Sequence, residues 1–88
     1  MRIYVIGSLS RLDRIESIAN HYKKFGHEVD HVEKTPNIPF EKLVEDCYAR
    51  INMADKIVAV TKKDGSIGKA TTYEVAFAKF LGKNIEIC

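Results

Sequence analysis

The sequence predicts an α/β protein with a four-stranded parallel sheet, strand order 2-1-3-4, and helices on both faces of the sheet. Continuous apolar runs at residues 3–6 and 57–60 are typical of strands buried on both faces, as central parallel strands are. The segments between the expected strands repeat their apolar residues at helical spacing. Because parallel crossovers are right-handed, we expect the two apolar strands to lie side by side at the centre of the sheet.

The first half of the chain reads as strand, helix and strand. Residues 2–6 form the first expected strand, which ends at Gly7. Ser10 is expected to cap the following helix, and Gly26 to end it. The apolar side of this helix is Leu12, Ile15, Ile18, Ala19 and Tyr22. Residues 27–32 are charged and poor in apolar side chains, so we expect a strand at the sheet edge.

The second half repeats this alternation. Residues 35–39 hold both prolines and predict a stiff loop. A helix is then indicated by Phe40, Leu43, Val44, Cys47 and Ile51. Residues 56–61 form the second buried strand, a third helix follows a glycine-bearing loop, and residues 84–88 form a second edge strand.

Length and composition predict one small domain over residues 1–88, with 45% hydrophobic and 30% charged residues. The net charge is +2 with scattered Lys and Arg, which argues against nucleic acid as a partner. We expect no signal peptide, no membrane span and no disulfide framework, and therefore a cytoplasmic protein. The three histidines lack the spacing of a metal site, and we expect neither metal nor cofactor.

The loop that precedes the last helix points to function. Asp64, Gly65 and Gly68 are typical of a loop, and Thr71 or Thr72 is expected to serve as a cap near the start of the helix. A loop that feeds a helix N-terminus presents unpaired N–H groups at the positive end of the helix dipole, which favours an anion.

A second turn is expected at the same edge of the sheet. Gly7, Ser8 and Ser10 follow the first strand, and the predicted order puts a topological switch between the first and third strands. Ligands of open α/β sheets bind at such a switch, outside the carboxyl ends of the strands. Both loops are therefore expected to line one crevice.

Glu74 is the candidate reactive group of this crevice. It lies early in a mostly apolar helix, and its neighbours Ala70, Thr71 and Ala78 are small enough for a ligand to approach it. The alternative is structural, because a carboxylate early in a helix commonly complements the dipole.

Other candidate residues also have ordinary structural alternatives. Tyr4 lies inside the first strand, where packing is an alternative to a functional role, and Asp55 is a turn residue before the third strand. Asp46 is expected on a solvated helix flank, and Asp64 in an Asp-Gly turn. Cys47 fits a position in the core better than a nucleophile, since no histidine is expected beside it.

Two common nucleotide-binding motifs and one signalling fold are excluded. The chain has neither a G-x-G-x-x-G fingerprint nor a P-loop. A phosphoacceptor receiver domain needs an aspartate at the end of the third strand, where Thr61 stands.

Three segments together resemble the nucleoside 2-deoxyribosyltransferase-like superfamily, which includes the 2'-deoxynucleoside 5'-monophosphate N-glycosidases. They are residues 3–8, residues 54–60 and the pattern Gly65-x-Ile67-Gly68-x-x-Thr71-x-x-Glu74-x-x-x-Ala78-x-x-x-Gly82-Lys83. The resemblance covers most of the chain, and its most specific part is the last pattern. It implies a flavodoxin-like sheet and chemistry at an N-glycosidic bond.

The resemblance also implies roles for individual residues. Glu74 would attack the anomeric carbon, Tyr4 would orient Glu74, and Asp55 matches an aspartate before the third strand of the family. Asp46, Asp55 or Asp64 could supply the acid. The residues that would hold a ribosyl 5'-phosphate are Ser8, Ser66, Gly68 and Thr71, with Gly7, Ser10 and Gly65 in the same two loops.

The sequence departs from the family pattern at three positions. Gly68 stands where the transferases have an aspartate, and Ser66 lies two residues before the serine of the hydrolases. Asp46 lies nine residues before Asp55, where the hydrolases place their helix aspartate eight before.

We therefore expect cleavage or transfer at the N-glycosidic bond of a small nucleoside or nucleotide. The chain is expected to form a homo-oligomer, a dimer by resemblance. The alternative is a module of the same fold that binds or senses nucleotides without catalysis.

Overall fold

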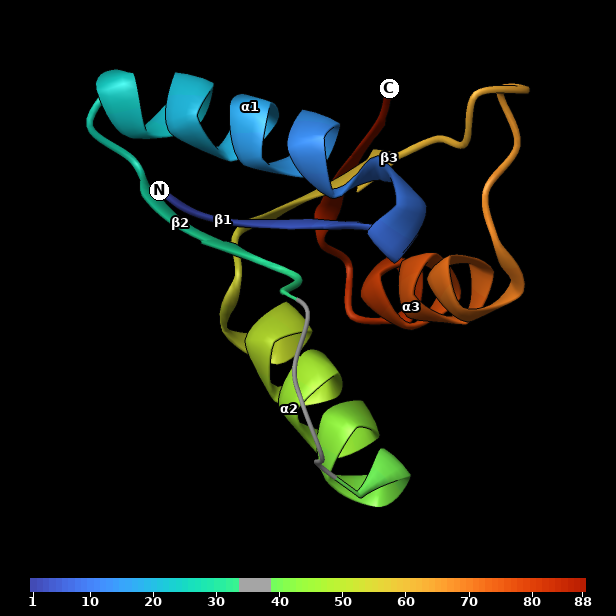
Figure 1. Cartoon of the computed structure of the whole chain (residues 1–88). Coiled ribbons are helices and arrows are strands. Elements are labelled where there is room, and N and C mark those ends of the chain that lie inside the picture. The colour runs from blue at the N-terminus through green and yellow to red at the C-terminus, as the bar shows by residue number, and fades with distance from the viewer. Residues whose placement is uncertain (34–38) are drawn as a thin grey trace.

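The computed structural model describes residues 1–33 and 39–88, without the side chain of Phe40. Most of the predicted proline loop, residues 35–38, lies outside the described residues. The elements follow one another as strands and helices in alternation (Figure 1). They are β1 (Arg2–Gly7), the short 3-10 helix η1 (Leu9–Arg11), α1 (Leu12–Lys24), β2 (Glu28–His31), α2 (Phe40–Met53), β3 (Lys56–Val60), α3 (Lys69–Phe80) and β4 (Asn84–Ile87).

The four strands form one parallel sheet of order β2-β1-β3-β4, which confirms the predicted order. β1 and β3 are the central pair, with Ile3 opposite Lys56 and Gly7 opposite Val60. Their side chains are buried on both faces, whereas β2 and β4 alternate or are largely exposed, as expected of edge strands.

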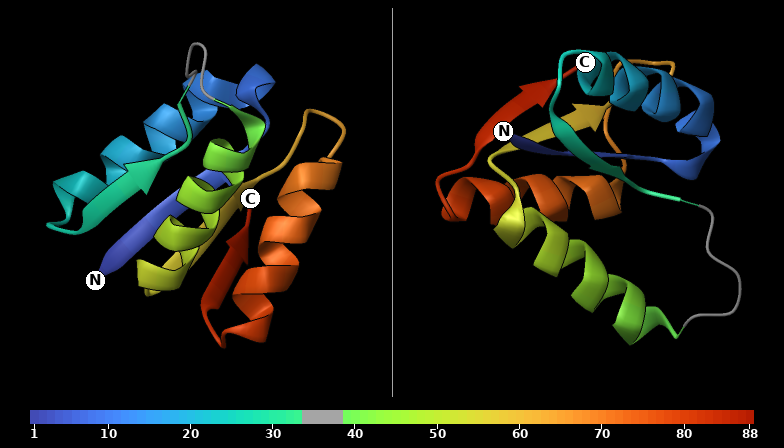
Figure 2. Two further views of the ribbon diagram at one scale, coloured as in Figure 1. Left: turned by 90° about the horizontal axis from the view of Figure 1, so that it is seen from below. Right: turned by 90° about the vertical axis from the view of Figure 1, so that its left-hand side faces the viewer.

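Helix α1 covers one face of the sheet, and α2 and α3 lie side by side on the other (Figure 2). Under α1, the buried cluster is Ile3, Val5, Ile15, Ala19, Val58 and Val60. Under α2 and α3, it is Tyr4, Ile6, Ile51, Ala54, Ile57, Ala59, Val75 and Ala78. Burial of these apolar side chains, at roughly 25 cal/mol for each Å² removed from water, is the main force that holds the helices on the sheet.

The carboxyl end of β1 is fixed by a close approach at Gly7. A Cβ atom at this position would lie 3.0 Å from the carbonyl oxygen of Val60 and 3.2 Å from Cδ1 of Ile15. Only a residue without a side chain lets β1, β3 and α1 meet this closely. The Ser8 turn therefore leaves the sheet directly beside the end of β3.

Two predicted helix caps are wrong. Ser10 does not cap α1, because a 3-10 turn precedes it, and the Ser8 hydroxyl instead accepts a hydrogen bond from the Ser10 N–H at 3.3 Å. Gly68 rather than a threonine stands at the N-cap of α3, and the Thr72 hydroxyl donates back to the Gly68 carbonyl oxygen at 2.9 Å.

In the described part of the chain, none of the helices has the length and apolar character that crossing a membrane requires.

Candidate functional site

A cavity of about 240 Å³ lies between α2 and α3. Its walls are mainly apolar, with Glu74 as the carboxylate among the described lining residues. The lining residues are Leu43, Val44, Cys47 and Tyr48 from α2, and Ala70, Tyr73 and Glu74 from α3. The small side chain expected at Ala70 thus lies beside Glu74 and leaves room for a ligand.

The carboxyl group of Glu74 is poorly solvated in this cavity. Its Oε2 atom is buried and has no hydrogen-bond partner among the described residues. Burial raises the pKa of Glu74 from 4.5 to about 7, because the charged form loses its water. A carboxyl group that is half ionised near neutral pH and opens into a cavity is typical of a functional site.

Tyr4 reaches the same region from the sheet. Its side chain is only 1% exposed, and its hydroxyl donates a hydrogen bond to Sγ of Cys47 at 3.6 Å. Burial, followed by this hydrogen bond, raises the pKa of Tyr4 above its usual range. Burial also raises the pKa of the Cys47 thiol. The negative charge of Glu74 raises both pKa values further, so the three groups form one electrostatic cluster.

The three aspartates considered as acids do not line this cavity. Asp46 lies on the exposed side of α2. Asp55 lies at the opposite edge of the sheet, where strands begin, and accepts a hydrogen bond from the Arg2 N–H at 2.8 Å. Asp64 accepts hydrogen bonds from the Ser66 hydroxyl at 2.7 Å and the Ser66 N–H at 3.0 Å, and these lower its pKa.

The two loops at the carboxyl edge meet around a second, basic hollow of about 440 Å³. It is lined by Ser10 and Arg11 from the first loop and by Lys62, Lys63 and Asp64 from the second. Within residues 1–33 and 39–88, none of these three cations forms an ion pair. The predicted convergence of the loops is thus present, but Glu74 lines a different cavity.

The residues expected to hold a phosphate are distributed unevenly around this hollow. Ser10 lines the hollow, and its hydroxyl forms a hydrogen bond of 2.9 Å with the Ser8 hydroxyl. The Ser66 hydroxyl donates a hydrogen bond to the Asp64 carboxylate. Gly68 lies beside the Lys62 side chain, since a Cβ there would lie 3.5 Å from Lys62 Cε. Thr71 is 4% exposed and does not face solvent. Gly65 has φ +87° and forms the turn, its N–H donating to the Lys62 carbonyl oxygen at 3.0 Å.

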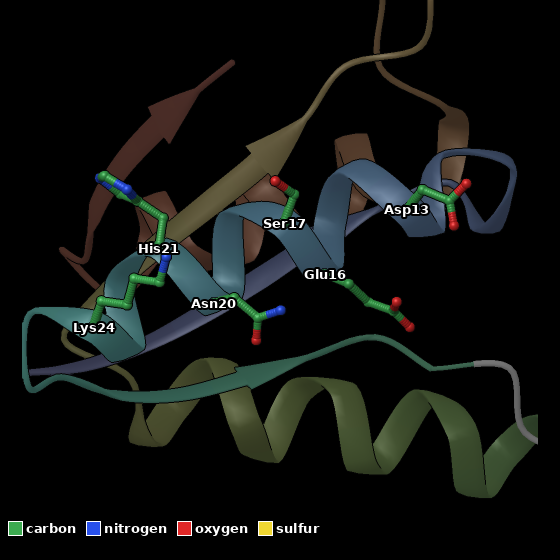
Figure 3. A pocket seen from close by; sticks show the side chains of 6 residues that line it. All are labelled: Asp13, Glu16, Ser17, Asn20, His21 and Lys24. Atoms are coloured by element: carbon green, nitrogen blue, oxygen red, sulfur yellow. The ribbon is translucent and has the colours of Figure 1, made fainter.

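Another hollow, of about 480 Å³, lies on the outer side of α1 (Figure 3). Its lining residues all belong to this one helix and are polar or charged: Asp13, Glu16, Ser17, Asn20, His21 and Lys24. With no second element contributing, this surface is a solvated helix face rather than a site. Among the described residues, no group of three or more His, Cys, Asp or Glu side chains could hold a metal ion.

Sequence reasoning missed Cys47 and the three cations. Cys47 is the residue that lies eight positions before Asp55, the spacing at which Asp46 failed to match the family pattern. The displacement of Asp46 by one residue from the family spacing was the signal in the sequence that could have pointed to Cys47. The clustering of Arg11, Lys62 and Lys63 could not be found from sequence, because it depends on how two loops meet in space.

The described site and fold are those of an α/β protein with a parallel sheet and a cavity that holds a buried carboxyl group. No family model matches the chain, and no curated protein matches it significantly in sequence. Solved structures, in contrast, match the fold of the chain. The CMP N-glycosidase BcmB of Clostridium botulinum superposes with a TM-score of 0.74 and 21% identity over 99% of this chain and 70% of its own.

A second solved structure, the 2-desoxiribosyltransferase of Leishmania mexicana, superposes with a TM-score of 0.70 and 22% identity. The alignment covers 98% of this chain, which spans 62% of the length of that enzyme. The chain therefore shares a flavodoxin-like α/β fold with these two enzymes, and this is the fold that the sequence predicted.

Proposed function

We propose that the protein cleaves, or transfers the sugar of, an N-glycosidic bond in a nucleoside or nucleotide, with Glu74 as the nucleophile. The observation that carries this proposal is the buried, unpartnered carboxyl group of Glu74 at the wall of an apolar cavity. Two enzymes that share the fold are, by name, a CMP N-glycosidase and a deoxyribosyltransferase.

The proposed reaction begins when the ionised Glu74 carboxylate attacks the anomeric carbon of the sugar. A C–O bond to Glu74 forms, the C–N bond breaks, and the base leaves with the electron pair and takes up a proton. Water, or a second base, then attacks the same carbon and releases the sugar from Glu74. Because the nucleophile must be ionised, we expect the rate to rise with pH through about 7.

The two hollows suggest how a substrate could be divided between them. The cavity at Glu74 is lined by Tyr48, Tyr73 and aliphatic side chains, which suits a planar ring. The basic hollow with Arg11, Lys62 and Lys63 suits a 5'-phosphate. We therefore propose that nucleoside 5'-monophosphates are preferred over nucleosides.

The alternative is a module that binds nucleotides without turnover, and one observation favours it. Among the described residues, the Glu74 cavity has no second carboxylate that could protonate the leaving base. Retaining glycosidases normally use two carboxylates about 5 Å apart. Apart from Glu74 itself, the lining side chains that carry a transferable proton are those of Cys47, Tyr48 and Tyr73, and the Tyr4 hydroxyl lies behind Cys47.

Chromatography of free base after incubation with a panel of nucleosides and 5'-monophosphates tests both functions. For the enzyme, we expect base release that falls about a thousand-fold or more in Glu74→Ala. No release from any compound, combined with a rise in melting temperature on adding a monophosphate, would instead establish the binding module.

A separate variant tests the proposed preference for 5'-monophosphates over nucleosides. Lys62→Ala should raise the KM for monophosphates by about tenfold, the effect of losing one charge-assisted hydrogen bond, and leave the KM for nucleosides unchanged. Lys24→Ala, on the outer side of α1, is the matched control and should change neither. Equal effects of Lys62→Ala on both substrate classes would contradict the proposed phosphate site.

We also propose that the protein acts as a homodimer through the α2–α3 face. Three large apolar side chains are exposed on it: Met53 at 60%, Tyr73 at 59% and Phe80 at 85%. The exposed charged residues of α3 are Lys69 and Lys79, whereas α2 exposes the acids Glu41, Glu45 and Asp46 together with Lys42 and Arg50. We propose that acids of α2 pair with the lysines of α3 across a two-fold axis.

A further inference from the structure

The Glu74 cavity combines one carboxyl group with aromatic walls. Among the described lining residues, Glu74 is the one that carries a charge, and neither Lys nor Arg is present. Tyr48 from α2 and Tyr73 from α3 supply the rings. Tyr48 makes an edge-to-face contact with Phe77, with ring centres 4.6 Å apart, which fixes its position. When Glu74 is ionised, the cavity is therefore a negatively charged space between aromatic side chains.

These surroundings favour a flat cation over a neutral ring of the same size. The face of a tyrosine ring attracts a cation, and a carboxylate attracts it more strongly where little water screens the charge. The buried Oε2 atom of Glu74 has no hydrogen-bond partner among the described residues, so the protein leaves this charge uncompensated. The Arg50 guanidinium lies 5.9 Å from the centre of the Tyr4 ring and donates to the His31 carbonyl oxygen, and it does not line the cavity. A cationic ligand would supply the missing positive charge.

The cavity also lacks a strong acid for a leaving base. A neutral base must take up a proton as it leaves, and a general acid with a pKa near the working pH speeds this step. No second carboxyl group lines the cavity among the described residues, and the sequence of residues 34–38 contains neither Asp nor Glu. The Cys47 thiol and the tyrosine hydroxyls are weaker acids than a carboxyl group, and burial raises the pKa of the thiol further. A base that is already positively charged needs no acid, because it leaves as a neutral molecule.

We propose that the Glu74 cavity binds nucleotides whose base is a positively charged aromatic ring, such as a pyridinium joined to the sugar through its ring nitrogen. The inference rests on the proposed role of Glu74 as the nucleophile. The carboxylate forms a C–O bond to the anomeric carbon, the C–N bond breaks, and its electron pair neutralises the ring nitrogen without transfer of a proton. Water then attacks the same carbon, the C–O bond to Glu74 breaks to restore the carboxylate, and the proton of the water passes to solvent.

The two hollows of the carboxyl edge and the α2–α3 face have the charges that such a substrate requires. A pyridinium 5'-monophosphate is negative at its phosphate and positive at its base. The hollow with Arg11, Lys62 and Lys63 is basic, and the cavity with Glu74 is acidic. A monophosphate with a neutral base is matched to the first of these charges alone.

Binding of two small probes of the same shape tests the recognition of charge without turnover. The probes are the cation 1-methylnicotinamide and its neutral counterpart 3-methylbenzamide, which has carbon in place of the ring nitrogen. In NMR titrations at about pH 8, the Kd of the cation should be lower by about tenfold or more. Glu74→Gln should remove most of this preference, whereas Glu16→Gln, on the outer side of α1, is the matched control and should keep it. Equal affinities, tighter binding of the neutral probe, or no binding of the cation would overturn the proposal.

Tyr73→Leu measures the part of the preference that comes from an aromatic ring. Tyr73 is exposed, so the substitution leaves the core intact, and leucine keeps an apolar wall without an aromatic face. The preference for the cation should fall by about two- to fivefold, and Tyr73→Phe, which retains the ring, should restore it. A preference that survives unchanged in both Glu74→Gln and Tyr73→Leu would place the cation elsewhere and overturn the proposal.

Turnover separates this inference from the proposed function. Release of base from nicotinamide mononucleotide and from CMP is compared by chromatography, with Glu74→Ala as the background for each compound. We expect kcat/KM to be higher for nicotinamide mononucleotide by about a hundredfold or more, because a missing general acid slows the release of cytosine by at least this factor. Faster release of cytosine would overturn the inference and leave the proposed function standing. Release from neither compound would contradict the proposed function, and the two binding probes then decide whether the cavity selects a cation.

Discussion

The buried carboxyl group of Glu74 lowers the stability of the folded protein when it is ionised. Its carboxyl group is ionised without difficulty in the unfolded chain, where water surrounds it, but not in the cavity between α2 and α3. A group whose pKa is raised by folding contributes stability below its unfolded pKa and loses it as the pH rises through the folded value. For Glu74 this window lies between 4.5 and about 7.

Replacing Glu74 by glutamine should therefore stabilise the protein at high pH only. At about pH 8 we expect Glu74→Gln to exceed the wild type by on the order of 2 kcal/mol in free energy of unfolding, a value reduced for partial exposure. At about pH 4 the carboxyl group is protonated in both states, and the difference should vanish. Urea unfolding of the variant and the wild type at both pH values measures this difference in free energy of unfolding.

Glu45→Gln on the exposed side of α2 provides the control. It removes the same charge from a solvated position and should show no pH-dependent gain. If Glu74→Gln and the wild type had the same free energy of unfolding at high pH, water would have to reach the Glu74 carboxyl group freely.

At the scale of single residues, the sequence singled out Glu74 as a candidate but did not predict the side chains that surround it. Glu74 stands out because its helix is otherwise apolar and its neighbour Ala70 is small. Cys47 looked like any apolar helix position, since its contact with Tyr4 joins residues far apart in sequence. Such contacts depend on side-chain rotamers and on the packing of α2 against the sheet.

At the scale of the elements, the junction of β1, β3 and α1 at Gly7 fixes the carboxyl edge of the sheet. The Ser8 turn and the loop of residues 61–68 both leave from this edge. A displacement there would move the basic hollow as well as the ends of both strands.

Gly7→Ala should destabilise the protein by about 1–3 kcal/mol, because overpacking a rigid site forces the backbone to shift. The added Cβ would meet the Val60 carbonyl oxygen and Ile15. Urea unfolding of Gly7→Ala and Gly26→Ala makes the comparison, since Gly26 has φ +85° but nothing within 4 Å. If Gly26→Ala lost as much stability, backbone conformation rather than close packing would be the cause.

The elements themselves were predictable because their signals are local. Apolar runs marked the central strands, and helical periodicity marked the helices between them. The helix starts were predicted wrongly at Ser10 and near Thr71 and Thr72, because a 3-10 turn and the cap at Gly68 displaced the first turns. Cap choice depends on the path of the preceding loop, which periodicity does not contain.

At the scale of the whole molecule, the sequence predicted one crevice for both loops and Glu74, whereas the described residues place the loops and Glu74 at two different hollows. The strand order correctly brought both loops to one edge. It could not predict that Glu74, further along α3, faces α2 instead. The direction of a side chain depends on the rotation of its helix about its axis, which follows from packing of the whole apolar face. A single domain and a cytoplasmic location stay predictions.

The proposed dimer is the prediction that belongs to this scale. Sedimentation equilibrium should give twice the 10.0 kDa mass of the chain. Phe80→Glu puts a charge on a highly exposed aromatic position of the proposed interface, at the C-terminal end of α3, and should shift the protein to the monomer. Phe25→Glu, at another exposed aromatic residue, just beyond α1, is the matched control and should stay dimeric. A wild-type protein that sediments as a monomer would contradict this interface.

The pairing of β1 with β3 also constrains how the chain can fold. The two strands that share the core are separated in sequence by α1, β2 and α2, so the central ladder closes a long loop before it gains any contact energy. During synthesis, α1 and β2 can collapse early onto β1, while the other face of that strand stays uncovered. The part of the core that includes Tyr4 and Ile6 therefore stays open to water during synthesis until α3, which supplies Val75 and Ala78 to that face, has left the ribosome.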